Sequence, residues 1–359
     1  MTHTPAAPEP DLTGFRQAVD ACLDRFLDRK AHTAAADELP PEIIDILRDF
    51  LFRGGKRLRP LLCACGWSAG AGGGETTRLV SVAAAMEMFH AFALIHDDVM
   101  DRSATRRGRP TVHRALATHH GAHRSQTAAE RLGASAAVLV GDLALVWSDE
   151  LLSTHLSPEQ LPAVRPYVDA MRTEVMYGQY LDLLNTGQLT GDIETPLQVI
   201  RYKTAKYTIE RPLHIGAALA GAGPAVLDAC TAFALPLGEA FQLRDDLLGV
   251  FGTPEQTGKP VLDDLRDGKH TVLIALALTR ANPHQDTILR TLLGSPDLDE
   301  NGAARIRAIL DSTGAHADTE HMIHTRYQQA LTALDRAPFP ATATAALRQI
   351  AHAATTRTA

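Results

Sequence analysis

The sequence has few aromatic residues, few cysteines and no excess of positive charge. Phe, Trp and Tyr make up only 5% of the 359 residues. The cysteines lack a paired C-x-x-C spacing, which indicates small buried thiols rather than a metal site or a disulfide framework. The formal net charge of -7 gives no overall basic field, so we expect no nucleic-acid partner.

Long uninterrupted apolar runs are also missing. No stretch reaches the ~18 consecutive apolar residues that a membrane span requires. The N-terminal segment MTHTPAAPEP lacks a positive stretch followed by an apolar one, so it does not read as a secretory signal. Its Pro- and Ala-rich composition predicts a disordered tail over residues 1–10. We therefore expect a cytoplasmic protein without stable membrane insertion.

The composition that is present favours helices. Hydrophobic residues make up 45% of the chain, and Ala and Leu, which lose little on entering a helix, are abundant. Apolar residues recur at helical spacing, and we find neither strand-and-hairpin patterns nor a fixed-period repeat. The patterns predict an all-α fold, with residues 11–359 forming one domain, a bundle of long helices around a central cavity. The expected helices begin near 11 and then cover 41–52, a segment ending near 68, 76–100, 127–153, 159–184, 195–220, 224–250, 268–281, 302–313 and 317–335.

The segment Asp97-Asp98-Val99-Met100-Asp101 ends one of these apolar stretches. Four residues separate Asp97 from Asp101, so on a helix both carboxylates share a face, about 5.4 Å apart along the axis. Two such carboxylates repel each other, and the C-terminal end of a helix disfavours negative charge further. Mg²⁺ bound to them removes both problems and still leaves room for phosphate oxygens. Taken alone, the pattern is also typical of a solvated acidic helix end.

A second acidic pair, Asp245-Asp246, follows another apolar run, PLGEAFQLRDDLLGVFG. In a bundle, two acidic helix segments can face each other across a cavity. Local groups of cations accompany them in this acidic chain, which indicates a polyanionic ligand with diphosphate-like charge. The groups are Lys56, Arg57 and Arg59; Arg102, Arg106, Arg107 and Arg109; Lys203 and Lys206; and Lys259 and Lys269.

With these residues the chain resembles the trans-type polyprenyl diphosphate synthases, from about residue 40 onward. The segments that carry the resemblance occur in the family's order, and a chance match of this kind is very rare. They are GGKRLRP (54–60), EMFH (87–90), DDVMD (97–101), RRGRPTVH (106–113), VGDLAL (140–145), GQYLDLL (178–184), YKTAKYT (202–208), FQLRDD (241–246) and GKPVLDDLRDGKHT (258–271).

The resemblance implies an enzyme that joins isopentenyl diphosphate to dimethylallyl, geranyl or farnesyl diphosphate, with three Mg²⁺ in each active site. It implies that Asp97 and Asp101 bind two ions and Asp245 the third, with Asp98 and Asp246 also part of the catalytic set. The allylic diphosphate would be held by Arg106, Lys203, Thr204, Gln242, Lys259 and Lys269. Isopentenyl diphosphate would be held by Lys56, Arg59, His90 and Arg107. Lys203 also belongs to the implied catalytic set.

The resemblance further implies a product length. In the family a single aromatic residue five positions before the first aspartate, without an insertion in the motif, goes with geranylgeranyl (C20) products. Phe92 holds that place, and Phe89 lies one turn earlier, so these rings lie about 7.5 Å and 12 Å from Asp97 along the helix. Helical geometry does not point Phe92 towards the face of Asp97, and plain core packing also explains both rings. Farnesyl (C15) is the alternative product.

Two departures and two alternative functions accompany the resemblance. Gly249 stands where the family's second motif ends in aspartate, which puts the affinity for the third ion in doubt, and Leu262 stands where glycine is common. A terpene cyclase would also carry the first motif, but it has no use for the isopentenyl diphosphate cations. A non-catalytic subunit of a heteromeric synthase would be expected to lose its metal aspartates.

Two further segments complete the sequence-based picture. The family implies a homodimer, with the apolar 127–153 helix as a candidate interface. The histidines His113, His119, His120 and His123 have no Cys or carboxylate set near them in the sequence, which favours a solvated loop over a metal site.

Overall fold

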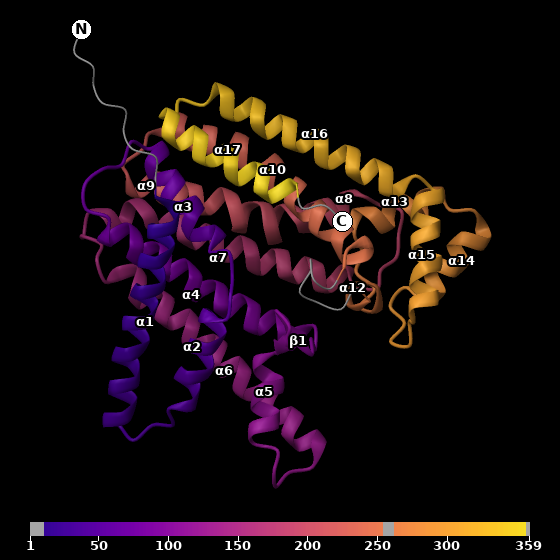
Figure 1. Ribbon diagram of the computed structural model, residues 1–359, viewed down its shortest axis with the longest axis horizontal. Helices are drawn as coiled ribbons and strands as arrows, with labels where there is room; N and C mark the ends of the chain where they lie inside the picture. The colour runs from indigo at the N-terminus through magenta and orange to yellow at the C-terminus, as the bar shows by residue number, and fades with distance from the viewer. Residues whose placement is uncertain (1–10, 254–261, 357–359) are drawn as a thin grey trace.

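In a computed structural model of the chain, residues 11–253 and 262–356 are described, and they form a bundle of helices (Figure 1). The all-α prediction is confirmed. The predicted tail over residues 1–10 and the implied ligand Lys259 lie outside the described residues, and the single domain over 11–359 stays a prediction. The N-terminal half contains α1 (Leu12–Ala36), α2 (Glu42–Phe52), α3 (Leu58–Ala69), α4 (Thr77–Met100), β1 (Thr105–Arg106), β2 (Arg109–Pro110), α5 (Val112–His119), α6 (Gln126–Ser153) and α7 (Gln160–Asn185).

The C-terminal half continues with the helices that close the bundle. In Figure 1 α16 and α17 lie along one edge, and α14 and α15 lie together at the end farthest from α1. The elements are α8 (Glu194–Val199), the π-helix η1 (Ile200–Glu210), α9 (Arg211–Leu219), α10 (Pro224–Phe251), α12 (Asp263–Arg266), α13 (Val272–Arg280), α14 (Pro283–Leu292), α15 (Glu300–Ser312), α16 (Ala315–Arg336) and α17 (Ala341–Thr355).

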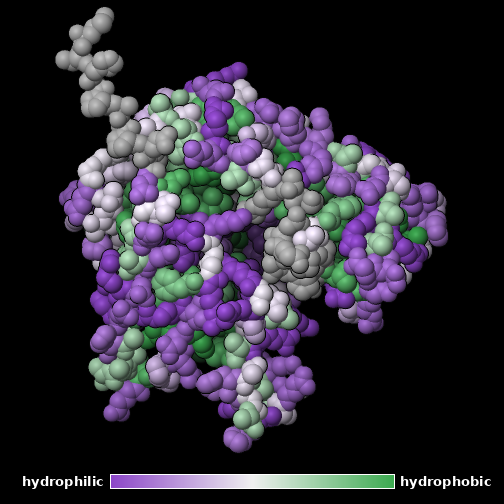
Figure 2. All heavy atoms as spheres, in the orientation of Figure 1, coloured by the Kyte–Doolittle hydropathy of each residue, from purple (hydrophilic) through white to green (hydrophobic). Residues whose placement is uncertain are grey.

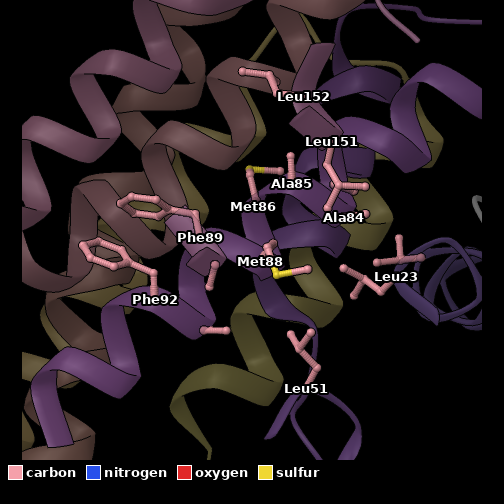
Figure 3. Close-up of a cluster of buried hydrophobic side chains, with 14 of the residues drawn as sticks. Leu23, Leu51, Ala84, Ala85, Met86, Met88, Phe89, Phe92, Leu151 and Leu152 are labelled. Atoms are coloured by element: carbon pink, nitrogen blue, oxygen red, sulfur yellow. The ribbon is translucent and has the colours of Figure 1, made fainter. Parts of the chain in front are cut away.

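Helix α4 is the central element of the N-terminal half. It packs against α1, α3 and α6, and most of its side chains are buried. Phe89 and Phe92 project to one side of α4, and Leu23 of α1 and Leu51 of α2 lie on its other side (Figure 3). Burying each such large apolar side chain stabilises the fold by roughly 1.5–3 kcal/mol. This packing explains why most of the α4 sequence is apolar.

Helices α4 and α6 are both long and apolar enough to cross a membrane. Of the apolar window in α4, 72% is buried inside the protein, as in the core helix of a soluble protein, whereas the window in α6 is only 33% buried. These windows are selected by mean hydropathy and include polar residues such as Ser81 and Glu87 of α4, so the prediction that no uninterrupted apolar run reaches about 18 residues is not contradicted. The exposed part of α6 is an apolar surface that needs an explanation.

The structure also contains elements that the sequence did not predict. Strands β1 and β2 form a two-residue antiparallel pair, with Thr105 opposite Pro110 and Arg106 opposite Arg109. Helices α5, α14 and α17 were not expected; α5 has only eight residues, too few for a clear period. Because α5 contains His113 and His119, the solvated-loop interpretation of the histidine-rich segment is wrong for these two residues.

The stretch predicted as one helix over 195–220 instead consists of three segments, the α-helices α8 and α9 with the π-helix η1 between them. Two glycines let neighbouring helices approach η1 closely. A Cβ on Gly178 of α7 would lie 2.4 Å from the backbone nitrogen of Lys203, and a Cβ on Gly238 of α10 would lie 2.4 Å from the Cα of Ala205. Helix η1 thus packs against both α7 and α10. Long π-helices are rare, and π-helical segments are frequent at functional sites.

Candidate active site

The first aspartate motif lies at the C-terminal end of α4, beside the β1–β2 hairpin. Asp97 and Asp98 are the last polar residues of the helix, and Asp101 is its C-cap. The guanidinium of Arg106 in β1 donates to both carboxylates, from Nε to Asp98 Oδ1 at 2.8 Å and from Nη2 to Asp97 Oδ2 at 3.0 Å. Asp98 is fully buried, so the guanidinium of Arg106, rather than water, balances its negative charge. The hairpin therefore holds Arg106 in place beside the motif.

Lys203 of η1 faces the same motif from across the bundle. Its Nζ donates to Asp182 Oδ2 of α7 at 2.6 Å and to Asp97 Oδ1 at 3.4 Å. Burial, followed by the neighbouring charge of Asp97, raises the pKa of the Asp101 carboxyl to about 6. Asp182 was not among the predicted site residues, although it lies in the GQYLDLL segment. The carboxylates gathered here exceed what one lysine neutralises, as expected of a site that takes up cations.

The second acidic pair lies on α10, and a chain of hydrogen bonds joins it to η1. Thr204 Oγ1 donates to Gln242 Oε1 at 2.7 Å, and Gln242 Nε2 donates to Asp246 Oδ1 at 2.9 Å. Burial raises the pKa of the Asp246 carboxyl to about 7, and the nearby carboxylates of Asp264 and Asp245 add to the shift.

Lys269 links the two acidic motifs. Burial alone would lower its pKa, but the carboxylates of Asp264, Asp101, Asp182 and Asp97 together raise it. Its Nζ lies 3.3 Å from Asp264 Oδ1. One ammonium thus lies within electrostatic reach of carboxylates from α4, α7 and α12. The structure therefore brings both predicted motifs to one place, with Asp182 and Asp264 as additional carboxylates.

Gly249, the departure from the family pattern, lies directly against Asp264. A Cβ built on Gly249 would meet Asp264 Oδ2 at 2.2 Å, which is closer than any carbon and oxygen can approach without movement. The space beside α10 that a side chain at 249 would occupy is therefore taken by the carboxylate of Asp264. The sequence offered no signal for this pairing, and Leu262 has no visible consequence in the described residues.

A second group of polar residues lies deeper along α4, around Tyr207 of η1. His90 Nδ1 lies 3.1 Å from the Tyr207 hydroxyl, and the Arg59 guanidinium lies 4.1 Å from the centre of the Tyr207 ring. Arg59 Nη2 also donates to Thr208 Oγ1 at 2.7 Å. Burial, and then the charges of Arg59 and Arg107, hold the pKa of His90 well below its usual value, so its imidazole is neutral at pH 7.

The loop between α2 and α3 borders this second group. Lys56 lies in that loop, and Arg107 Nη1 of the hairpin donates to the Gly54 carbonyl at 2.7 Å. Arg57 looked from the sequence like another phosphate-binding cation, but its side chain is buried. It donates to Glu87 of α4 at 2.9 Å and to Asp20 of α1 at 2.7 Å, so it anchors the loop instead.

The site as a whole combines a carboxylate-rich end with a cation-rich side. The carboxylate-rich end offers only oxygen atoms as metal ligands, which suits Mg²⁺ rather than a softer metal. Figure 2 shows hydrophobic atoms within a hollow near the centre of this face, surrounded by hydrophilic side chains. Such an arrangement can hold a metal-bound anion at the polar end and an apolar chain in the interior.

The comparisons with known proteins agree with this geometry. The sequence profile of the polyprenyl synthetase family matches residues 40–310. The geranylfarnesyl diphosphate synthase of Aeropyrum pernix is 34% identical, over 79% of this chain and 84% of its own. The (2E,6E)-farnesyl diphosphate synthase of Mycobacterium tuberculosis is 29% identical, over 88% of this chain and 87% of its own.

Solved structures give the same result. The geranylgeranyl pyrophosphate synthase of Corynebacterium glutamicum, determined with isoprenyl diphosphate and magnesium, superposes with a TM-score of 0.92 at 41% identity. The match covers 97% of this chain and 100% of that one. The chain belongs to the polyprenyl synthetase family. Within that family it is a short-chain prenyl diphosphate synthase, a prenyltransferase, as the sequence predicted.

Proposed function

We propose that the protein condenses isopentenyl diphosphate with dimethylallyl, geranyl and farnesyl diphosphates and stops at geranylgeranyl diphosphate (C20). The observation that supports this proposal most is the arrangement of two separate cation groups around α4. Arg106, Lys203 and Lys269 surround the aspartates, whereas Arg59 and Arg107 lie at the His90 end. An enzyme that joins two diphosphates needs two such places, and a cyclase needs only one.

The carboxylates fit Mg²⁺, and we propose three ions in each active site. Asp97 and Asp101 would hold two of them and Asp245 the third, and the bound ions would stabilise negative charge on the departing diphosphate. Arg106, Lys203 and Lys269 would hold the same diphosphate, while Thr204 and Gln242 would orient it. Asp98 keeps Arg106 in position, and Asp246 holds Gln242.

The reaction that these residues support breaks one C–O bond and forms one C–C bond. Diphosphate leaves the allylic substrate with the electron pair of the C–O bond, and the remaining allylic cation is attacked by the double bond of isopentenyl diphosphate. A proton is then lost from the new chain to the departing diphosphate. The cations stabilise the growing charge more than the ground state, which lowers the barrier. The neutral His90 and the Arg59 and Arg107 guanidiniums would keep isopentenyl diphosphate in place during the step.

The length of the product is proposed to depend on two rings of α4. Phe89 and Phe92 lie with ring centres 5.2 Å apart, and both are buried. The Phe92 ring also lies 4.7 Å from that of His96, and the Arg172 guanidinium lies 5.4 Å from the Phe89 ring. On an ideal helix Phe92 is turned about 140° from Asp97 and Phe89 about 80°. Phe89 is therefore nearer the face of the aspartates, and Phe92 supports it from behind.

The test is to incubate the protein with Mg²⁺, isopentenyl diphosphate and each allylic starter, and to identify the dephosphorylated alcohols by mass spectrometry. We expect geranylgeraniol from the wild type and longer alcohols from both variants, because Phe89→Ala removes the ring nearer the aspartate face and Phe92→Ala removes the ring that supports it. Phe15→Ala on α1 is the control and should leave the product unchanged.

The outcomes separate the alternatives. Farnesol as the final product of the wild type would keep the chemistry and replace C20 by C15, the length made by the mycobacterial relative. Unchanged product lengths in both variants would refute the role of the two rings. A cyclic hydrocarbon formed without isopentenyl diphosphate would indicate a cyclase, and no product from any starter would indicate a non-catalytic subunit.

We also propose that the protein is a cytoplasmic homodimer that buries the exposed apolar side chains of α6 and α7. Leu139 and Val146 of α6 are 61% and 60% exposed, and Tyr177 of α7 is 65% exposed. The other exposed large apolar side chains on these two helices are Val138, Met176, Tyr180, Leu183 and Leu184. Exposed apolar side chains gathered into a patch typically mark a protein interface.

The dimer proposal predicts that Leu139→Glu yields a monomer, since a buried unpaired carboxylate opposes association. Light scattering coupled to size-exclusion chromatography measures the mass directly. Leu39→Glu is a matched control, because Leu39 is 57% exposed and lies away from α6 and α7 in the sequence. A wild-type protein of monomeric mass would refute the proposal.

A further inference from the structure

The histidine-rich segment forms a cluster that the proposed reaction does not use. His119 lies in the last turn of α5, His120 is the C-cap of that helix, and Glu42 begins α2. His120 Nε2 lies 3.1 Å from Glu42 Oε1, and the centres of the two imidazole rings are 4.7 Å apart. One possible ligand atom from each of the three residues lies within 4.8 Å of the other two. The fold thus supplies the carboxylate that these histidines lack in the sequence.

The three side chains offer two imidazole nitrogens and one carboxylate oxygen. This donor set suits Zn²⁺ and the neighbouring transition metals, and it does not suit Mg²⁺, which prefers oxygen ligands alone. Three protein ligands leave a fourth tetrahedral position for water. The C-terminal end of α5 adds partial negative charge at the same point, which favours a cation there. All three residues are at least partly accessible, so an ion can reach them from solvent.

We propose that Glu42, His119 and His120 form a Zn²⁺ site that joins α2 to α5. It is separate from the magnesium site, because no residue of the two aspartate motifs takes part.

The position of the site gives it a structural role. Helix α2 leads into the loop that contains Lys56, and α5 follows directly on the hairpin that contains Arg106 and Arg107. The hydrogen bond from Arg107 to the Gly54 carbonyl joins these two segments at the active-site end. A bound ion would join them at the opposite ends of the same two helices. The pair would then be fixed at both ends, and the loop and the hairpin would keep their relative position.

The experiment measures metal binding to the full-length protein, produced without a polyhistidine tag and freed of metal by chelation. Zn²⁺ is titrated by calorimetry in buffer containing excess Mg²⁺, so that the aspartate motifs are occupied. We expect His119→Ala, His120→Ala and Glu42→Gln each to weaken Zn²⁺ binding at least about tenfold. His123→Ala is the matched control, because His123 is exposed, lies three residues after His120 and is not in the cluster.

Co²⁺ in place of Zn²⁺ identifies the ligands independently of affinity. Nitrogen ligands in a four- or five-coordinate site give a much stronger visible absorption than an all-oxygen octahedral site. We expect that absorption in the wild type and in His123→Ala, and its loss in His120→Ala. Zn²⁺ should also raise the melting temperature of the wild type and not that of His120→Ala. Equal Zn²⁺ binding by the wild type and all three variants, or a Co²⁺ spectrum of the octahedral all-oxygen kind, would overturn the proposal.

Discussion

Replacing Asp97 with asparagine will lower kcat at least about 10³-fold, a loss of roughly 4 kcal/mol of transition-state stabilisation. The Asp97 carboxylate faces Arg106 and Lys203 at once, at 3.0 Å and 3.4 Å, and it is one of the proposed Mg²⁺ ligands. The amide removes the negative charge that organises these cations. Steady-state rates of product formation at saturating Mg²⁺ and substrates measure the effect.

The matched control for Asp97→Asn is the same change at Asp169 of α7. Asp169 is half exposed and pairs with Arg165 on the same helix, four residues away. Surface pairs of this kind contribute little, so activity should stay within about twofold of the wild type. If Asp97→Asn kept activity within tenfold of the wild type while remaining folded, the aspartate motif would not be the metal site.

Introducing the aspartate that the family's second motif usually has, by Gly249→Asp, will lower activity roughly 10–100-fold, about 1.4–2.7 kcal/mol. The new Cβ would overlap Asp264 Oδ2, which lies 2.2 Å from its position, and the new carboxylate would repel that of Asp264. The measurements are kcat and the Mg²⁺ concentration that gives half-maximal activity. Gly223→Asp at the start of α10 is the control, since a Cβ at that position meets nothing within 4 Å.

The double variant Gly249→Asp with Asp264→Gly tests the reason for the loss. It removes the overlap and leaves one carboxylate near Asp246 and Lys269, now carried by α10 instead of α12. We expect it to recover most of the activity lost in Gly249→Asp. A gain of activity in Gly249→Asp alone, or no recovery in the double variant, would show that Asp264 does not occupy the place of the missing aspartate.

The sequence was sufficient for the long buried helices and for the motifs at their ends. Helix α4 is buried over most of its surface, so most of its sequence is apolar, and Asp97 and Asp101 stand at its C-terminal end. Local composition says less about partners that are distant in the chain. Asp182 reaches Lys203 only because α7 packs against η1, and Asp264 reaches Gly249 only because α12 returns to α10.

The sequence also fails to distinguish charged residues that face the core from those that face the site. Arg57 and Arg59 look alike in the sequence, but Arg57 is buried against Glu87 and Asp20, whereas Arg59 stacks on Tyr207. Which arginine faces a cavity and which faces the core depends on the left-handed backbone at Arg57, with φ of 50°. A residue other than glycine seldom adopts this conformation, so no sequence pattern announces it.

The π-helical winding of η1 also sets the direction in which its first polar side chains point relative to its later ones. Lys203 and Thr204 face the aspartates, whereas Tyr207 and Thr208 face Arg59 and His90, so one helical segment contacts both groups of polar residues. A π-helix has more residues per turn than the 3.6 of an α-helix, so α-helical winding of the same residues would turn one pair relative to the other. In the proposed reaction, the residues that hold the two diphosphates would then no longer keep their relative orientation. Under the proposed assignment of the two substrates, their alignment depends on the pitch of a backbone as well as on the identity of side chains.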